Sequence, residues 1–359
     1  MKANARFRIV LLVVLVTVFF TSAGVAGTGV KVMTYNVDEG TDFAAIIAVL
    51  TNPNATAADF QTALAATIAE VESSHPEVRM PLIAHEIAAA QPGLVGLQEV
   101  AIWTSPTIPI NNGTLDFLQL ILAGLGQSYT PVVMQTEFQI DLTAQFGVSF
   151  KDQDVILVRT DLANAITGSN SSHYHHLFQV PASQFLPAFS ITRGWVSADV
   201  TLNGTEFSFI TTHLEDGTNK TSPLFALVQA EQEIELVSGP ASTRLPVIIA
   251  GDFNTVANNP FNLTFLTYSF MLANGFIDAW SRTHPFQIFG GATCCQEDLT
   301  ILQSELTQRL DQVFVRNHVS VVPFGTQVVG NHVDFSIYGD SWPSDHAAVK
   351  SALQIGSLP

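Results

Sequence analysis

The chain has 359 residues, of which 47% are hydrophobic and 13% are charged, and its formal net charge is −17. This length and composition provide enough apolar residues for a sizeable core, which excludes a disordered protein. The acidic balance argues against a tight, non-specific binder of nucleic acid, because such binders neutralise many phosphates with basic side chains.

Residues 1–26 have the pattern of a secretory signal peptide. Three basic residues precede an apolar run at 9–20, and small residues follow up to Ala26. This order predicts cleavage after Ala26 and a secreted or periplasmic protein. An uncleaved anchor helix is the alternative, but the run is short for a span of about 20 residues. Cleavage would leave one catalytic domain, 27–359, whose charge falls from −17 to −20 because three basic and no acidic residues are lost.

The only two cysteines, Cys294 and Cys295, are adjacent in the sequence. Neighbouring Cα atoms lie about 3.8 Å apart across a trans peptide bond, which is closer than in most disulfides. Two free thiols are therefore expected, and a vicinal disulfide or a link to another chain are the alternatives. Six Asn-x-Ser/Thr sequons would matter only in a host that glycosylates secreted proteins. They begin at Asn54, Asn112, Asn170, Asn203, Asn219 and Asn262.

The first predicted element after the signal segment is a strand that ends in polar groups. Residues 30–37 alternate as a strand does, and the strand reaches Asn36 with Asp38 just beyond it. Two alanine-rich segments, 57–71 and 78–90, follow with apolar residues at helical spacing.

The next strand also ends in an acidic residue. A short apolar run at 94–97 predicts this strand, and Glu99 stands two residues beyond it. A helix is predicted at 115–125, and strands are predicted at 132–135 and 155–159 with a segment of uncertain form between them.

A histidine and aromatic cluster lies in the middle of the chain. It contains His173, His175 and His176 and continues with aromatic residues to Phe189. The histidines suggest a zinc site, but no cysteine or carboxylate has ligand spacing, so an exposed strand or loop near a cleft is expected. The aromatic residues could also form an exposed apolar hairpin, although a buried strand pair would have the same pattern.

A hairpin follows Arg193. Its strands are predicted at 196–202 and 206–212, joined by an Asn-Gly turn, and His213 stands at its end. Arg193 could present a basic group to a phosphate or form a salt bridge at the start of the strand.

The clearest strand of the chain is the apolar run 247–250, which follows a predicted helix at 223–236. Three of its four residues are β-branched, which favours a strand that is buried on both faces. Asp252 and Asn254 come directly after it. Residues two apart on an extended segment point the same way, so these side chains should face one place.

The C-terminal part supplies the last polar groups. A helix is predicted at 262–273, and residues 283–307 form an irregular excursion that holds the cysteine pair. Further strands are predicted at 309–315, which carries Asp311, at 319–322, at 326–329 and at 347–353, which Asp345 and His346 precede.

Several strands therefore deliver carboxylate, amide or imidazole groups at their ends. Oxygen donors without cysteine suit Mg²⁺, Mn²⁺ or Ca²⁺, and Mg²⁺ commonly binds one or two carboxylates together with substrate phosphate. A histidine beside an acid can activate water, and amides can hold phosphoryl oxygens. Hydrolysis of a phosphate ester is the reaction that these groups serve best.

The order of the motifs resembles that of the endonuclease/exonuclease/phosphatase superfamily, which includes pancreatic deoxyribonuclease and neutral sphingomyelinases. The short triplets are not specific alone, but G-D-F-N and S-D-H together with an early Q-E are. The matching stretches are M-T-Y-N-V (Met33–Val37), G-L-Q-E-V (Gly96–Val100), T-T-H-L-E (Thr211–Glu215), G-D-F-N (Gly251–Asn254), R-L-D (Arg309–Asp311) and S-D-H (Ser344–His346).

The resemblance implies a role for each matched side chain. Glu99, Asn36 and Asp345 would form the metal site, to which Asp38 is a further candidate because some apurinic endonucleases have an acid there. Asp311 and His346 would form a pair that orients or activates water, and Asp252 would handle a proton. Asn254 and His213 would bind phosphoryl oxygens, with Arg193 as a further phosphate ligand. The choice of general base between Asp252 and His346 stays open.

The resemblance also implies a fold and a function. The fold is a four-layer α/β/β/α sandwich of two mixed, largely antiparallel sheets with helices outside, and the Asn-Gly hairpin agrees with it. The activity is that of a monomeric, divalent-cation-dependent phosphodiesterase or endonuclease. A sphingomyelinase-type lipid phosphodiesterase is the alternative substrate class, and a non-catalytic binding module on the same fold is the rival of another class.

Overall fold

The computed structural model describes residues 27–219, 222–333 and 341–356. The predicted signal peptide lies outside the described residues. Across the described ranges, none of the helices has the length and apolar character that a membrane span requires.

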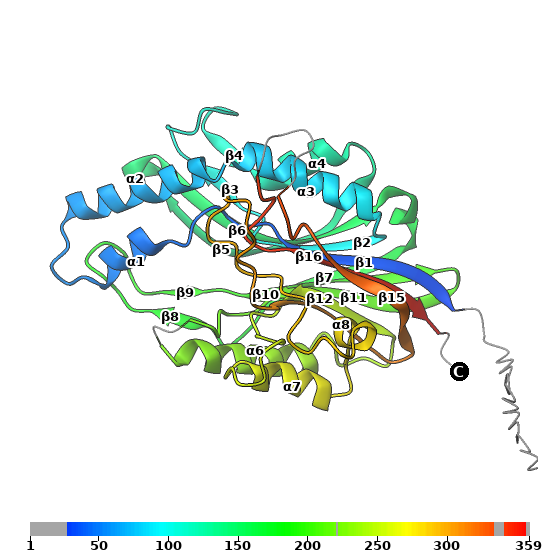
Figure 1. The fold of residues 1–359 in the computed structure, drawn as a ribbon. Coiled ribbons are helices and arrows are strands. Elements are labelled where there is room, and N and C mark those ends of the chain that lie inside the picture. Colours follow the sequence, from blue (N-terminus) through cyan, green and yellow to red (C-terminus); the bar gives the residue numbers. More distant parts are fainter. Residues whose placement is uncertain (1–26, 220–221, 334–340, 357–359) are drawn as a thin grey trace, which may run out of the picture.

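The described strands form two mixed β-sheets that pack face to face, and a small hairpin (Figure 1). The first sheet consists of β1 (Thr28–Asn36), β2 (Leu94–Gln98), β3 (Ile102–Thr104), β4 (Thr114–Asp116), β5 (Tyr129–Leu142), β6 (Val148–Arg159), β15 (Val319–Val329) and β16 (Ala348–Ile355). The second consists of β7 (Ile166–His173), β10 (Gly194–Leu202), β11 (Thr205–His213), β12 (Val247–Asp252), β13 (Ile277–Asp278) and β14 (Asp311–Arg316). The hairpin pairs β8 (Phe178–Val180) with β9 (Phe189–Ile191).

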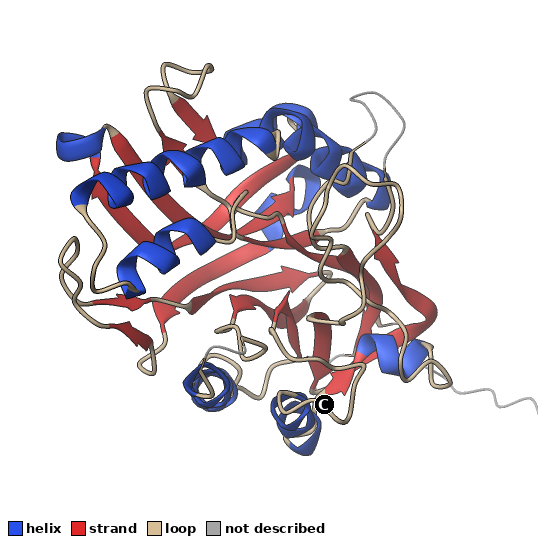
Figure 2. Ribbon diagram, turned by 60° about the vertical axis from the view of Figure 1, so that its left-hand side comes forward, coloured by secondary structure: helices blue, strands red, loops and turns tan. Residues whose placement is uncertain are grey.

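Helices cover the outer face of each sheet (Figure 2). The helices between β1 and β6 are α1 (Ala44–Thr51), α2 (Ala57–Ser73), α3 (Pro76–Ala90), α4 (Phe117–Leu125) and α5 (Thr143–Phe146). Those that follow are the 3₁₀ helix η1 (Thr160–Ala165), α6 (Leu224–Ser238), α7 (Phe265–Ala273) and α8 (Ala279–Thr283). Helices α2, α3 and α4 pack on the first sheet, and α6 and α7 pack on the second.

Strand alternation explains the layers. On β1, Val32 faces the second sheet whereas Met33 faces the helices of its own side. On β12, Ile248 packs between the sheets and Ile249 packs toward α6 and α7. Because successive side chains of a strand point to opposite faces, strands that are buried on both sides need apolar residues at every position. The predicted four-layer sandwich is therefore confirmed.

The order and direction of the strands determine which strand ends lie together. The order is β15-β16-β1-β2-β6-β3-β4 in the first sheet, where β5 also pairs with β6, and β13-β14-β12-β11-β10-β7 in the second. The pairs β1–β2 and β11–β12 are parallel, and the other described pairs are antiparallel. The polar ends of β1, β2, β11 and β12 therefore come to the junction of the two sheets.

Some predicted boundaries are wrong. The helix predicted at 115–125 begins at Phe117, because the preceding residues form β4 and the Asp116 side chain caps the helix by accepting from Gln119 N. The uncertain segment between two predicted strands is part of the long β5–β6 hairpin. The two strands predicted near 319–329 are a single strand with an irregularity between Val321 and Thr326.

The aromatic segment from His173 to Phe189 is not an exposed apolar hairpin. The ring of Phe178 stacks on Phe225 with centroids 3.8 Å apart, and Phe189 packs on Phe138. These contacts attach the β8–β9 hairpin to α6 and to β5. The segment is therefore a half-buried hairpin, between the two predicted alternatives.

Gly96 lets the two sheets approach closely beside the polar strand ends. A β-carbon at this position would overlap the Thr211 side chain of β11. Thr211 has no room to move, because its hydroxyl donates to Ala250 O at 2.6 Å and accepts from Gln98 Nε2 at 2.7 Å.

We expect Gly96→Ala to lower the free energy of unfolding by about 1–3 kcal/mol, the usual cost of overpacking a core. Urea denaturation measures this loss. Gly356→Ala is the matched control, because its added methyl group meets its nearest atom, His318 O, at an ordinary 3.4 Å. Equal stability of the two variants would contradict the close approach at Gly96.

Candidate active site

Strand register brings the predicted site residues together. In the parallel pair β1–β2, Asn36 lies opposite Gln98, so Glu99 follows at the same edge. In the second sheet His213 pairs with Asp252 across β11–β12, and Asp252 pairs with Asp311 across β12–β14. Backbone pairing alone therefore places these side chains in one cluster.

The side chain of Asn36 joins the two sheets. Its amide nitrogen donates to Glu99 Oε1 at 2.8 Å and to Asp252 Oδ2 at 3.1 Å. Its oxygen accepts from the backbone nitrogen of Asp38 at 3.0 Å, and Glu99 Oε2 accepts from Glu39 N at 3.0 Å. The amide thus orients one carboxylate from each sheet.

Three site residues have left-handed backbone conformations. The φ angles are 59° at Asp38, 57° at Glu99 and 52° at Asn254. Such conformations cost a non-glycine residue about 1–3 kcal/mol and cluster at functional sites. At Asn254 the turn ends the strand alternation, so the predicted extended geometry from Asp252 to Asn254 is wrong. Their proximity comes instead from the turn, in which Asn254 N donates to Asp252 Oδ1 at 2.8 Å.

His213 faces the acids with one nitrogen and Arg193 with the other. Arg193 Nη1 donates to His213 Nδ1 at 2.9 Å. His213 Nε2 lies 3.1 Å from the side-chain nitrogen of Asn254, 3.6 Å from Asp252 Oδ2 and 3.9 Å from Glu99 Oε1. Burial and the Arg193 charge lower the pKa of His213 well below its usual value, so the ring is neutral.

Arg193 lies behind His213 rather than beside the acids of the cluster. It contacts Nδ1, the ring nitrogen opposite to the one that faces Asp252, and Asp152 Oδ2 lies 3.8 Å from its Nη1. Burial would lower the pKa of the guanidinium, but the carboxylates of Glu215 and Asp152 outweigh burial and raise it. Arg193 therefore orients His213 as a fixed cation, and direct contact with a phosphate stays a prediction.

Asp311 and His346 form the predicted pair. His346 Nδ1 lies 2.8 Å from Asp311 Oδ2 and 3.8 Å from Asp252 Oδ2. Burial alone would lower the pKa of His346, but the charges of Asp311, Asp345 and Asp252 raise it well above its usual value. The ring is therefore a cation at neutral pH, with Nε2–H as a donor.

A short turn fixes His346 to β1. The hydroxyl of Ser344 donates to the backbone oxygen of Asn36 at 2.8 Å and accepts from His346 N at 3.0 Å. Burial and the neighbouring charge of Asp38 raise the pKa of Asp345, in the same turn, to about 8. The structure thus brings all ten predicted side chains into one region, and their individual roles remain predictions.

Two participants were missed by sequence reasoning. Arg79 of α3 is fully buried, forms an ion pair with Asp38 at 3.2 Å and donates to Val37 O and Pro343 O. Asp152 of β6 is buried beside Arg193. Arg79 stands among the apolar residues of an expected helix, and this was the available signal for it. Asp152 stands shortly before an expected strand, which was the signal in its case.

The donor set fits a hard divalent cation. Its carboxylate and amide groups offer only oxygen toward such an ion, which suits Mg²⁺ and similar cations. Asp311 Oδ1 is buried without a hydrogen-bond partner, and burial together with the charge of Asp311 raises the pKa of Asp252 to about 7. So many acids in one place favour either bound protons or a bound cation.

Two histidines of the cluster contact a carboxylate on α6. The Nδ1 atoms of His175 and His176 lie 2.8 Å and 2.7 Å from the two carboxylate oxygens of Glu235 on α6. His173 contacts Gln135 and Thr136 O on β5. Among the described residues, these histidines belong to no group with the spacing of metal ligands.

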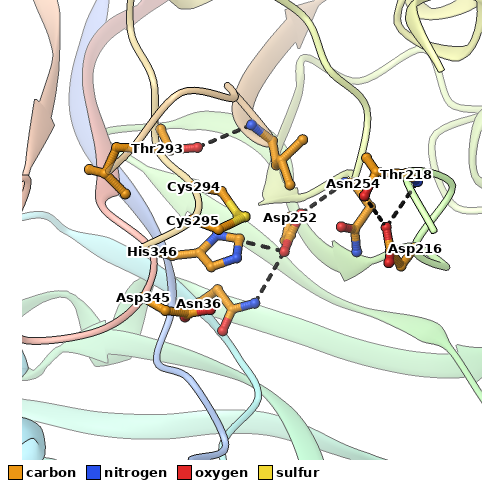
Figure 3. Close-up of a disulfide and its surroundings, with 12 residues drawn as sticks. Asn36, Asp216, Thr218, Asp252, Asn254, Thr293, Cys294, Cys295, Asp345 and His346 are labelled. Atoms are coloured by element: carbon orange, nitrogen blue, oxygen red, sulfur yellow. Dashed lines mark hydrogen bonds and ion pairs between the residues drawn. A yellow bond between two sulfur atoms is a disulfide. The ribbon is translucent and has the colours of Figure 1, made fainter. Parts of the chain in front are cut away.

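Cys294 and Cys295 form a disulfide with each other, so the expectation of two free thiols is wrong. The usual separation of Cα atoms in a disulfide describes pairs that are distant in sequence, and the vicinal alternative applies here. Figure 3 shows the two sulfur atoms beside the ring of His346.

The family model described as Endonuclease/Exonuclease/phosphatase family matches residues 33–346. Among curated protein sequences, none matches the chain.

Solved structures share the fold but few residues. An endonuclease/exonuclease/phosphatase family protein from Bacteroides thetaiotaomicron is 18% identical, covers 92% of this chain and 98% of its own, and has a TM-score of 0.56. The mannosyl-6-phosphatase of the same organism is 17% identical, with coverages of 90% and 99% and a TM-score of 0.53. D. rerio TDP2, complexed with a single-strand DNA product, is 16% identical, with coverages of 91% and 99% and a TM-score of 0.53.

Without a divalent cation, we expect the protein to lose stability as pH rises from 6.5 to 8.5. The folded-state pKa values of Asp252, about 7, and of Asp345, about 8, exceed the unfolded value of about 3.9. The folded state therefore binds more protons, and this stabilisation is lost as pH rises through those values. The raised pKa of His346 acts in the same direction, whereas the lowered pKa of His213 opposes it only near pH 6.5, where the unfolded ring is still partly protonated.

Thermal unfolding in EDTA should give a melting temperature that is several degrees lower at pH 8.5 than at pH 6.5. Mg²⁺ or Mn²⁺ should restore it at pH 8.5, because a ligand that binds only the folded state stabilises it. Asp252→Asn should reduce the pH dependence, and the exposed Asp199→Asn should not. A melting temperature that is independent of pH in EDTA would contradict the acid cluster.

Proposed function

Because the chain belongs to the endonuclease/exonuclease/phosphatase family, we propose that it is a divalent-cation-dependent phosphoric ester hydrolase and, more narrowly, a phosphodiesterase. The observation that carries the proposal is the convergence of Glu99, Asp252 and the Asp311–His346 pair at the junction of the two sheets. A non-catalytic module would not need strained backbone and buried, closely spaced acids in the same place.

Glu99, Asn36 and Asp345 would hold the cation, with Asp38 beside them. Glu99, Asp345 and Asp38 are partly exposed, whereas Asp252 and Asp311 are buried. When bound, Mg²⁺ or Mn²⁺ would neutralise charge on the phosphoryl oxygens. Ca²⁺ offers the same hard character with a looser geometry.

The protein side chains would divide the remaining work between proton transfer and binding. Asp252, with a pKa of about 7, accepts a proton from the attacking water at Oδ2. His346 stays protonated, held by Asp311, and donates from Nε2 toward the phosphoryl group or the leaving oxygen. His213 and the Asn254 amide bind phosphoryl oxygens. This assignment makes Asp252 the base and His346 the acid.

The charge of the site favours a diester over a monoester. A phosphate monoester carries more negative charge than a diester at neutral pH and needs more cationic partners. The two arginines of the described site are already engaged, Arg79 with Asp38 and backbone oxygens, and Arg193 with His213 and Asp152. A singly charged diester therefore fits better.

A lipid diester is the second candidate, because an exposed apolar segment lies on the excursion that carries the disulfide. Phe286, Ile288 and Phe289 are 97%, 63% and 68% exposed. Three large apolar side chains within four residues are unusual on a soluble surface and are typical of a lipid or partner contact. These residues replace the aromatic segment at 173–189 as the candidate lipid contact.

We also propose that the protein is exported, on the basis of the charge and apolar pattern of residues 1–26. The acidic charge of the remaining chain favours a compact ester over a long polyanion. Action as a monomer is part of the same proposal.

The purified chain should hydrolyse bis-p-nitrophenyl phosphate with Mg²⁺ or Mn²⁺, and EDTA should abolish the reaction. Glu99→Ala should lower kcat/KM by at least about 100-fold, because a principal ligand of the cation is lost. Glu206→Gln, an exposed acid on the β11 side of the Asn-Gly turn, is the matched control and should keep full activity. Full activity of Glu99→Ala would contradict the proposed site.

Parallel assays with plasmid DNA, sphingomyelin vesicles and inositol phosphates should separate the substrate classes. If the substrate is a lipid, Phe286→Ser/Phe289→Ser should lose at least about tenfold in activity on vesicles and keep its activity on bis-p-nitrophenyl phosphate, because only vesicle binding needs the apolar segment. Cleavage of DNA alone would remove the lipid candidate.

A further inference from the structure

The Thr293–Gln296 segment lies outside the matched motifs and contacts both members of the Asp311–His346 pair. Thr293, Cys294 and Gln296 are almost fully buried. The segment belongs to the irregular excursion before β14, so strand pairing within the two sheets does not explain its position.

Hydrogen bonds attach this segment to the backbone on either side of the pair. On the Asp311 side, Thr293 Oγ1 accepts from the backbone nitrogens of Leu310 and Asp311, both at 3.1 Å. On the His346 side, Ala347 N donates to Thr293 O at 2.6 Å, and Gln296 N donates to Asp345 O at 2.8 Å. The segment therefore connects two strand ends whose side chains must meet.

The disulfide occupies the middle of this connection. Cys294 forms isolated bridges with Gln308 and His346 and packs on Val256 and Leu310. The sulfur atoms of Cys294 and Cys295 and a ring nitrogen of His346 all lie within 4.8 Å of one another (Figure 3). Cys294 is 1% exposed, whereas Cys295 is partly exposed and gives reagents access to the bond.

Breaking the bond would disturb this packing. Bonded sulfur atoms lie about 2.05 Å apart, but non-bonded heavy atoms need about 3.5–4.0 Å. Two thiols would therefore push apart inside a site that is packed against His346. Opening the small ring also returns torsional freedom to both cysteines. A shift of about 1 Å in a catalytic group can lower the rate about 100-fold.

We propose that the Cys294–Cys295 disulfide is a thiol-exchange site that controls the Asp311–His346 pair: the oxidised form positions the pair for hydrolysis, and reduction to two thiols lowers the activity. This inference rests on the proposed hydrolase function for its activity readout. The agent that it requires is a dithiol reductant. An oxidising compartment outside the cytosol would keep the protein active.

Reduction of the disulfide proceeds by two successive thiol–disulfide exchanges. A thiolate of the reductant attacks the Cys295 sulfur, the sulfur–sulfur bond breaks, and Cys294 leaves as a thiolate that takes up a proton. The second thiol of the reductant then attacks the mixed disulfide and releases Cys295 as a thiol. Two electrons and two protons have moved from the reductant, which becomes a disulfide.

The test compares the full oxidised chain with the same chain after reduction by dithiothreitol and removal of the reductant without air. Thiol titration verifies that two thiols have formed. With bis-p-nitrophenyl phosphate and Mg²⁺, kcat should fall at least about tenfold while KM changes less than about twofold, because positioning and not binding is lost. Oxidised glutathione should restore kcat. Two titrated thiols with an unchanged kcat would overturn the proposal.

Cys294→Ser/Cys295→Ser mimics the open pair and covers the case in which the buried bond resists reduction. Its kcat should be low and insensitive to reductant and oxidant, while its melting temperature stays near that of the parent. A doubly substituted chain with full kcat would refute the proposal.

Hydrogen exchange tests the inference without any activity. On reduction, the amides of Gln296 and Ala347 should exchange at least about tenfold faster, whereas the amide of Val32 within β1 should not change. If the oxidised chain hydrolyses no ester but these amides respond, the proposed function fails and the link between disulfide and pair stands. Equal exchange in both forms refutes the link.

Thr293 provides an independent check of the positioning role. Thr293→Val removes the acceptor for Leu310 N and Asp311 N and should lower kcat about tenfold with little change in KM. Thr293→Ser keeps the hydroxyl and should stay within about twofold of the parent. A fully active Thr293→Val would show that the segment does not position the pair.

Discussion

The side-chain amide of Asn36 is the interaction on which the arrangement of the site depends. It is fully buried and donates to Glu99 from the first sheet and to Asp252 from the second. Its own backbone oxygen accepts from Ser344, which fixes the turn that carries His346. One residue at the end of β1 therefore fixes the positions of two carboxylates and of the turn that carries His346. A site at the junction of two sheets needs such a connection, because the hydrogen bonds within one sheet do not fix the position of the other sheet.

Bringing these acids together in a buried site is electrostatically unfavourable. Burial and nearby acids raise the pKa values of Asp252 and Asp345 far above those of free carboxyls, whereas His346 becomes more basic beside them. The same negative charges therefore give Asp252 a pKa near neutral pH and keep His346 cationic, although the two side chains lie within 4 Å of each other. A divalent cation would relieve the repulsion among the acids, so structural stability and proposed catalysis would depend on the same ion.

Sequence patterns were sufficient for elements whose burial is uniform. The run at 247–250 favoured a buried strand, and in the structure its register brings Asp252 opposite Asp311. Prediction failed where tertiary contacts determine the local conformation. The left-handed turn at Asn254 and the buried guanidinium of Arg79 depend on partners that are distant in sequence. The cysteine pair was misjudged because the Cα separation usual for distant cysteines was given more weight than the vicinal alternative.

The irregular excursion before β14 contrasts with the rest of the site. Strand ends carry the matched side chains, and sheet register makes their positions hard to alter without unfolding the core. The excursion has little such support, yet it reaches the backbone next to Asp311 and His346 and also exposes Phe286 and Phe289. Changes there could alter substrate contact or the pair's geometry while the sheets remain intact. In the proposed scheme, the strand ends would determine the reaction type, and the excursion would determine control and substrate choice.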